Sequence, residues 1–204
     1  INKKTHIVVS KLPRNEDYLT NYDGYVVTTE HFDLANPVTK VDDIPDYEMY
    51  SQTIDSLNKR FGNRVLKGIE IGYIASEKDR IIDYLADKDY DLKLLSVHHN
   101  GQFDYLDDEV KDMDPAIVIP QYFAQLSEAL VVIEADVFAH FDYGFRVFGL
   151  SVAEFKQYEA QFLPILDQVI KNKLAFELNA KSAYLYDNLA LYEYVIDLYL
   201  SRGG

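Results

Sequence analysis

The chain has 204 residues, a formal net charge of −14 and no cysteine. This length predicts one domain with a self-sufficient core, and the missing cysteine excludes disulfides, thiolate zinc sites and cysteine nucleophiles. The acidic balance argues against nucleic acid as a main partner, and no apolar run reaches the roughly 18 residues of a membrane span. Because the start of the chain shows no signal-peptide pattern either, we expect a cytoplasmic protein without a membrane partner.

Six short apolar runs, each bounded by polar or turn residues, predict six buried strands. They are His6–Ser10, Gly24–Thr29, Leu66–Ile71, Lys93–His98, Val137–Phe141 and Leu174–Leu178. Helical periodicity between them predicts helices over Pro45–Phe61, Ser76–Ala86, Pro120–Ile133, Ser151–Lys171 and Asn188–Leu200. Strands that alternate with helices favour an α/β fold with a mostly parallel sheet in one domain, residues 1–204.

The polar residues with a possible functional role cluster at the carboxyl ends of the predicted strands. Active sites of β/α barrels are built at these ends, so we predict a barrel rather than an open sheet. The segment between Ser10 and Gly24 is short for a helical crossover, which usually needs about a dozen residues or more. The sequence also stops at Gly204, just after a predicted helix, where the alternation would next require a strand.

All five histidines lie in or just after predicted strands: His6, His31, His98, His99 and His140. Glu70 lies inside an apolar strand that has no structural use for a carboxylate. Converging strand ends would bring these groups together, and His nitrogen with carboxylate oxygen makes a metal site. Adjacent strand residues face opposite ways, so only one of His98 and His99 is expected to point inward. Purely local hydrogen bonding of each histidine is the alternative.

Five short motifs occur in an order that is similar to that of a known family. They are Thr28–Asp33 (TTEHFD), Gly68–Gly72 (GIEIG), Leu95–His99 (LSVHH), Ala139–Asp142 (AHFD) and Phe176–Asn179 (FELN). Together they resemble the PHP (polymerase and histidinol phosphatase) superfamily, in particular its histidinol-phosphatase branch. The resemblance implies a distorted β/α barrel of about seven strands, of which six are visible here. It also implies two or three divalent ions, variously zinc, manganese or iron.

The resemblance assigns metal ligands residue by residue. Glu70 would bridge the metals, with His98 and His140 beside it and His31 at the third metal position. His6 would be the second histidine of the family's opening His-x-His motif. All five residues are therefore candidate ligands, and the family gives no catalytic group beyond the ligands themselves.

Two positions depart from the family pattern. Lys4 stands where the first histidine of the opening motif belongs, and Asn2 stands where an Asp precedes it. A protonated lysine has no lone pair for a metal, so one metal position loses a ligand. The family also ends with a strand carrying Ser-Asp-x-His, which would begin where this sequence ends. We therefore expect that the sequence lacks its last strand and part of the first crossover.

The implied reaction is hydrolysis of a phosphomonoester, above all L-histidinol phosphate in histidine biosynthesis. Hydroxide generated at the metals would attack phosphorus. Arg146 is our candidate for holding the phosphate through paired hydrogen bonds, with a solvated loop cation as the alternative. Asn179 could contact the substrate or cap a turn. Asp142 could orient His140 from behind or itself approach the rim of the barrel.

Three functions remain open at this stage. The first is a histidinol-phosphatase-like enzyme acting on a small phosphorylated substrate. The second is a phosphoesterase of the same fold that acts on another phosphorylated substrate. The third is a degenerate barrel that binds without catalysis, which Lys4 and the missing closing motif would suit. The oligomeric state is not indicated by the sequence.

Overall fold

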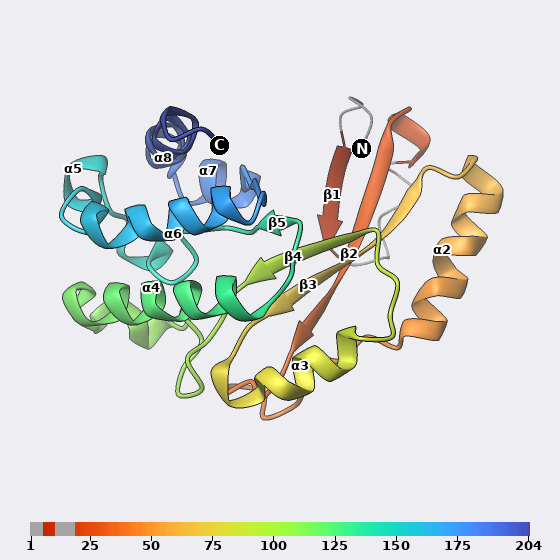
Figure 1. Ribbon diagram of the computed structural model, residues 1–204, viewed down its shortest axis with the longest axis horizontal. Helices are drawn as coiled ribbons and strands as arrows, with labels where there is room; N and C mark the ends of the chain where they lie inside the picture. Colours follow the sequence, from red (N-terminus) through yellow and green to blue (C-terminus); the bar gives the residue numbers. More distant parts are fainter. Residues whose placement is uncertain (1–5, 11–18) are drawn as a thin grey trace.

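The computed structural model describes residues 6–10 and 19–204, with side chains described from residue 19 onward. Its six strands form one sheet in which every neighbouring pair is parallel (Figure 1). They are β1 (His6–Ser10), β2 (Tyr25–Asp33), β3 (Val65–Gly72), β4 (Leu92–Ser96), β5 (Val137–Phe138) and β6 (Ala175–Phe176).

Strand order in space follows strand order in the chain, β1-β2-β3-β4-β5-β6. A doubly wound sheet reverses its order at a switch point, whereas a barrel is wound in one direction, and this sheet is wound as a barrel. Thr29 of β2, Glu70 of β3, Leu94 of β4 and Val137 of β5 line one cavity of about 370 Å³. The sheet therefore curves around an interior, and it stays open between β6 and β1 over the described strands.

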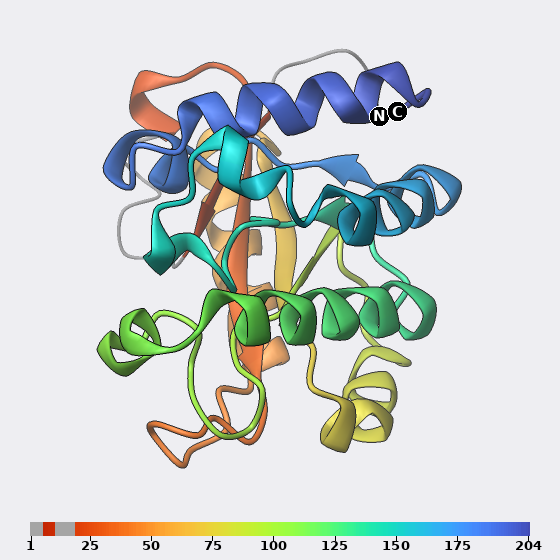
Figure 2. The same cartoon turned by 90° about the vertical axis from the view of Figure 1, so that its left-hand side faces the viewer.

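Seven helices that lie wholly within the described residues surround this sheet. They are α2 (Tyr47–Phe61), α3 (Lys78–Leu85), α4 (Pro115–Val132), α5 (Val152–Phe155), α6 (Glu159–Lys171), α7 (Ala180–Leu185) and α8 (Leu189–Ser201). Figure 2 shows α4, α6 and α8 stacked one above the other on one side of the molecule. Helix α4 packs against both α6 and β4, while α2 packs against β3.

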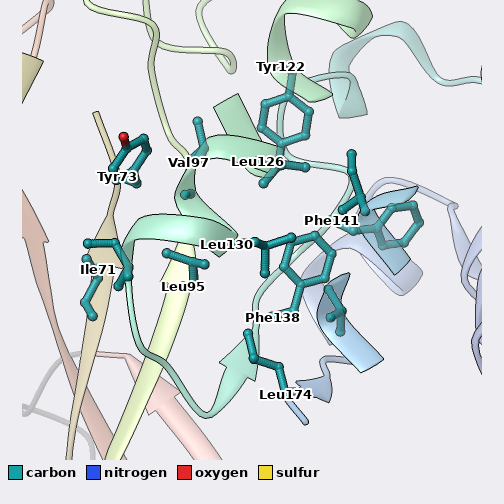
Figure 3. Packing of buried hydrophobic residues seen from close by; sticks show 14 of the residues in the cluster. Ile71, Tyr73, Leu95, Val97, Tyr122, Leu126, Leu130, Phe138, Phe141 and Leu174 are labelled. Carbon is teal, nitrogen blue, oxygen red and sulfur yellow. The ribbon is translucent and has the colours of Figure 1, made fainter. Parts of the chain in front are cut away.

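Successive side chains along β3 point alternately into the hydrophobic core and into the cavity on the other face of the sheet. Ile69 and Ile71 are fully buried and join the hydrophobic core beneath the helices, whereas Glu70 lies between them and faces the cavity. Figure 3 shows Ile71 and Leu95 from neighbouring strands beside Leu130 of α4. Because successive strand residues point to opposite faces, one face carries the core and the other is free for polar groups.

Helix α4 is long and apolar enough to cross a membrane by length and composition alone, with a mean hydropathy of 1.2 over 18 residues. Its apolar character has a structural explanation, because seven of its side chains are buried. They are Val118, Ile119, Tyr122, Phe123, Leu126, Ala129 and Leu130. The helix begins at Pro115, five residues before the predicted Pro120. Asp114 caps it by accepting a hydrogen bond from Ala116 N, and a proline at the first position is preorganised for a helix.

The sequence patterns predicted the strand positions well and some of their lengths poorly. Strand β2 continues four residues beyond Thr29, so His31 lies within it. Strand β5 ends at Phe138 rather than at Phe141, because the backbone N–H of His140 donates to Glu177 Oε2 at 2.6 Å instead of continuing the ladder. The predicted crossover after Ser10 lies largely outside the described residues.

The single helix predicted over Ser151–Lys171 is wrong, because the chain turns between α5 and α6. The predicted capping box at its start is confirmed: Ser151 Oγ accepts from Glu154 N, and the Glu154 carboxylate accepts from Ser151 N. Helix α7 was not predicted. It is short, and its first turn is stabilised by Asn179, whose side chain accepts from Ser182 N.

Candidate metal centre

Four neighbouring strands bring imidazole and carboxylate groups together at their carboxyl ends. Strand β2 supplies His31 and Asp33, and β3 supplies Glu70 opposite His31 in the parallel register. His98 follows β4 and His140 follows β5. The sequence prediction that these strand ends converge is confirmed for the residues that the structure describes.

Glu70 lies at the centre of the cluster. Its Oε1 is 3.0 Å from His98 Nε2 and 2.8 Å from His140 Nε2, and its Oε2 is 3.6 Å from His31 Nε2. Three imidazoles from three strands thus direct the same ring nitrogen toward one buried carboxylate.

Asp33 holds two of these imidazoles from the other side. Its Oδ1 is 2.6 Å from His98 Nδ1, and its Oδ2 is 3.2 Å from His31 Nδ1. Outer carboxylates of this kind fix ring orientation in metal sites and raise the basicity of the ligand. Asp33 was not among the predicted site residues, although the His-x-Asp spacing places it on the same strand face as His31. The end of β2 was predicted too early for that signal to be used.

Gly72 makes room for this arrangement. A Cβ atom at Gly72 would lie 1.8 Å from Asp33 Oδ1 and 3.1 Å from His98 Nδ1. Both distances are shorter than van der Waals contact, so a side chain at this position would displace the carboxylate. The glycine at the end of β3 is therefore a spatial requirement of the cluster.

The protonation of the cluster follows from its opposite charges. Burial disfavours the charged form of Glu70, but hydrogen bonds from His140 and His98 outweigh burial and hold the pKa of Glu70 well below its usual value. Burial likewise lowers the pKa of His98, but the nearby Asp33 and Glu70 carboxylates raise it to about 10. The hydrogen bond to Asp33 raises the pKa of His31.

The donor set fits a divalent metal. His31, Glu70 and His98 each offer one ligand atom, and these atoms lie within 4.8 Å of one another. His140 adds a third ring, at hydrogen-bond distance from Glu70, and its buried Nδ1 has no hydrogen-bond partner among the described residues. Nitrogen and carboxylate donors suit zinc, iron and manganese. A bound cation would take the place of the protons that the imidazoles and carboxylates share.

Of the two remaining histidines, the structure describes the side chain of His99 alone. His99 is buried but turns away, and its Nδ1 accepts from the backbone N–H of Gly101. The prediction that only one of His98 and His99 points inward is therefore confirmed. His6 lies in β1, paired with Tyr25 of β2, but its side chain is outside the described part of the structure. Lys4 and Asn2 also lie outside the described residues.

Arg146 is buried and fixed in place near the cluster. Its Nε and Nη2 donate to the two carboxylate oxygens of Asp142, at 3.1 and 2.9 Å. Its guanidinium carbon lies 5.6 Å from the ring centroid of Tyr143 and 5.3 Å from that of Tyr186. The solvated-loop alternative for Arg146 is wrong, because the side chain is 4% exposed.

Asp142 forms hydrogen bonds with Arg146 and not with His140. The fully buried carboxylate accepts further hydrogen bonds from Tyr192 Oη at 2.8 Å, Asn188 Nδ2 at 3.1 Å and the Ser182 hydroxyl. None of its hydrogen bonds goes to His140, so the expectation that it orients that ring is not met. Asp142 points away from the rim because its donors come from α7, α8 and the turn before α8, elements that the strand motif alone could not locate.

One pocket joins the metal ligands to the arginine. It has a volume of about 320 Å³ and is lined by His31, Asp33, Asn36, Glu70, His98, Asp104, Leu106, His140, Tyr143, Arg146, Asn179 and Lys181. Both predicted substrate residues, Arg146 and Asn179, line it. Asn179 also caps α7 and donates to Glu177 Oε1 at 3.2 Å, so the capping alternative is realised as well. Asp104, Tyr143 and Lys181 were not predicted as site residues. Asp104 and Tyr143 lie in loops, where single polar residues carry no periodic signal, and Lys181 lies in α7, a helix that was not predicted.

A sheet wound as a β/α barrel, with a histidine and carboxylate cluster at its strand ends, defines a metal-binding barrel protein. Residues 18–181 match the sequence model of the PHP domain. The chain belongs to the PHP domain family.

The chain is also similar to a solved structure. That structure is the crystal structure of histidinol phosphate phosphatase from Lactococcus lactis subsp. lactis Il1403, complexed with zinc, L-histidinol and phosphate. The match has a TM-score of 0.83 at 20% identity and covers 98% of this chain and 82% of that chain. It confirms the predicted fold. No curated protein matches the chain.

Proposed function

We propose that this protein is a metal-dependent phosphomonoesterase that hydrolyses L-histidinol phosphate, using two or three divalent ions. The observation that carries the proposal is that a fixed guanidinium and a convergent His/carboxylate cluster line the same pocket. Family membership supports hydrolysis, and the structural neighbour supports the substrate, since that enzyme was crystallised with zinc, L-histidinol and phosphate.

One group of pocket residues would bind the metal ions, and another would bind the phosphate. His31, Glu70, His98 and His140 would hold the ions. When bound, these ions supply positive charge to the phosphate oxygens and lower the pKa of a water molecule that attacks phosphorus. Asp33 keeps the His31 and His98 rings turned so that Nε2 faces Glu70.

Arg146 would bind and orient the phosphate group. Nε and one N–H of Nη2 donate to Asp142, so within the described structure the two N–H groups of Nη1 and the second of Nη2 have no protein acceptor and can donate to a phosphate. Because five donors converge on Asp142, the guanidinium is held before the substrate arrives. Preorganised charge of this kind stabilises the transition state without reorganisation at the moment of reaction. Lys181, also on the pocket wall, would add a second positive charge.

The experiment has two readouts, metal content and phosphate release. Protein purified without chelator should contain two or three divalent ions per chain and release phosphate from L-histidinol phosphate with added Mn²⁺ or Zn²⁺. Glu70→Gln should lose metal and reduce kcat by several orders of magnitude. Glu134→Gln, which changes an exposed carboxylate before β5, is the matched control and should retain both. Equal turnover in Glu70→Gln would refute the proposal.

A substrate panel separates the two phosphoesterase functions. L-histidinol phosphate, 4-nitrophenyl phosphate and a nucleoside monophosphate present the same phosphate on different alcohols. We expect the highest kcat/KM with L-histidinol phosphate. A higher value for either other compound would transfer the assignment to another phosphorylated substrate, and a protein without metal and activity would fit a binding role.

A further inference from the structure

The pocket contains one carboxylate that neither the metal ligands nor the arginine uses. Asp104 lines the pocket, and its Oδ1 accepts from Leu106 N at 2.9 Å and from the Tyr143 hydroxyl at 3.2 Å. Within the described part of the chain, nothing forms a hydrogen bond or ion pair with Asp104 Oδ2. One oxygen of this carboxylate therefore remains available to accept a hydrogen bond.

The loop that carries Asp104 is folded back on a metal ligand. Tyr105 N donates to the backbone carbonyl of His98 at 3.0 Å, and Asp104 forms an antiparallel bridge with His99. Asn100 Oδ1 closes the turn by accepting from Gln102 N and Phe103 N. The carboxylate is thus held by the backbone at a fixed place beside His98.

Tyr143 separates Asp104 from the positive side of the pocket. Its hydroxyl donates to Asp104, and its ring lies against Arg146, His98 and His140. Arg146 pairs with Asp142, so it does not neutralise Asp104. On one side the pocket carries the positive charge of Lys181 and the N–H groups of Arg146, whose charge Asp142 compensates. On the other side, Asp104 is a carboxylate that forms no ion pair with the described residues.

A carboxylate beside a phosphate site is electrostatically unfavourable for substrate binding if the phosphate is the substrate's single charged or hydrogen-bonding group. It repels the phosphate dianion, and like charges at short range are unfavourable in a partly enclosed pocket. The arrangement becomes favourable when the alcohol part of the substrate carries a cation or an N–H donor, because a charged hydrogen bond then forms at the anionic end.

We propose that Asp104 is a specificity-determining residue, which accepts a hydrogen bond through Oδ2 from a nitrogen of the substrate's alcohol group. The substrate class is then a phosphomonoester of an amino or imidazole alcohol. This inference rests on the proposed function, and it adds the residue that selects the alcohol. Tyr143 is a positioning residue that presents Asp104.

The test compares Asp104→Asn with the wild type on two substrates in the metal-loaded protein. Asparagine keeps an oxygen for Leu106 N and the Tyr143 hydroxyl but turns an amide N–H₂ group toward the substrate's donor. For L-histidinol phosphate we expect kcat/KM to fall about 10- to 100-fold, the usual effect of losing a charged hydrogen bond. For 4-nitrophenyl phosphate, which has no nitrogen donor, we expect a change of less than about threefold. Asp108→Asn, four residues further along the chain and with an exposed side chain, should change neither.

Calorimetric titration with L-histidinol, the unphosphorylated alcohol, tests the inference without turnover. Binding to the wild type that weakens at least tenfold in Asp104→Asn would support it, even for a protein inactive on both esters. An equal loss on both esters would assign Asp104 a structural role through Tyr143 and overturn the inference. Unchanged kcat/KM for L-histidinol phosphate, or no binding of L-histidinol to the wild type, would overturn it as well.

Discussion

Replacing Gly72 with alanine should disable the metal centre through a single methyl group. The new Cβ would lie 1.8 Å from Asp33 Oδ1, and van der Waals separation is roughly 3.5 Å, so the carboxylate must move by about 1.7 Å. A shift of that size breaks the 2.6 Å contact with His98 and the 3.2 Å contact with His31. Gly72 lacks a positive φ, so the effect is steric.

The magnitude follows from the contacts that are lost. A hydrogen bond that involves a charged group contributes about 1.5–3 kcal/mol, so the two contacts predict a loss of about 3–6 kcal/mol in the free energy of unfolding of the metal-free protein. Loss of a carboxylate that orients ligand imidazoles typically weakens metal binding by about 10- to 100-fold. Denaturant titration measures the first quantity, and competition with a chelator measures the second.

A double-mutant cycle shows whether the methyl group acts through Asp33. If it does, Gly72→Ala should add little to the loss already caused by Asp33→Ala, because the displaced carboxylate is then absent. Additive losses would mean that the alanine perturbs β3 itself. Wild-type metal affinity in Gly72→Ala would refute the assignment of Asp33 as the group that orients His31 and His98.

Three further changes test other parts of the site. Tyr192→Phe removes one donor from the buried Asp142 carboxylate, so it should lower the free energy of unfolding, measured by denaturant titration, by about 2 kcal/mol. It should also raise the inhibition constant for inorganic phosphate several-fold and leave the metal content unchanged. An unchanged inhibition constant would count against Arg146 as the phosphate ligand. In the metal-free protein, His98 has a pKa raised from 6.5 to about 10, so its stabilising contribution is full below pH 6.5 and is lost as the pH rises to about 10. The melting temperature should therefore fall more steeply with pH over this range in the wild type than in His98→Gln. Parallel curves would contradict the raised pKa of His98. Zinc uptake near pH 7 should release protons from His31 and His98, measurable in weakly buffered solution, and no release would contradict the raised pKa values.

Some features of this protein could be predicted from the sequence because they depend on local repetition. Alternation of apolar strands with helical patterns predicted an α/β fold with a parallel sheet, and all six predicted strands are present in that sheet. The position of His31, Glu70, His98 and His140 at strand ends predicted their convergence, since parallel strands present their carboxyl ends at one edge. The motifs that carry them also identified the family.

Other features were decided by contacts between residues far apart in the chain. The buried Asp142 carboxylate accepts hydrogen bonds from residue 182 in α7, residue 188 just before α8 and residue 192 in α8, and no local pattern places those donors against it. The end of β5 depends on Glu177, which takes the backbone N–H of His140. Asp33 and Gly72 acquire their roles only through the register of β2 against β3. Local sequence sets which face of a strand a side chain occupies, whereas the partner that it meets there depends on how the strands and helices pack.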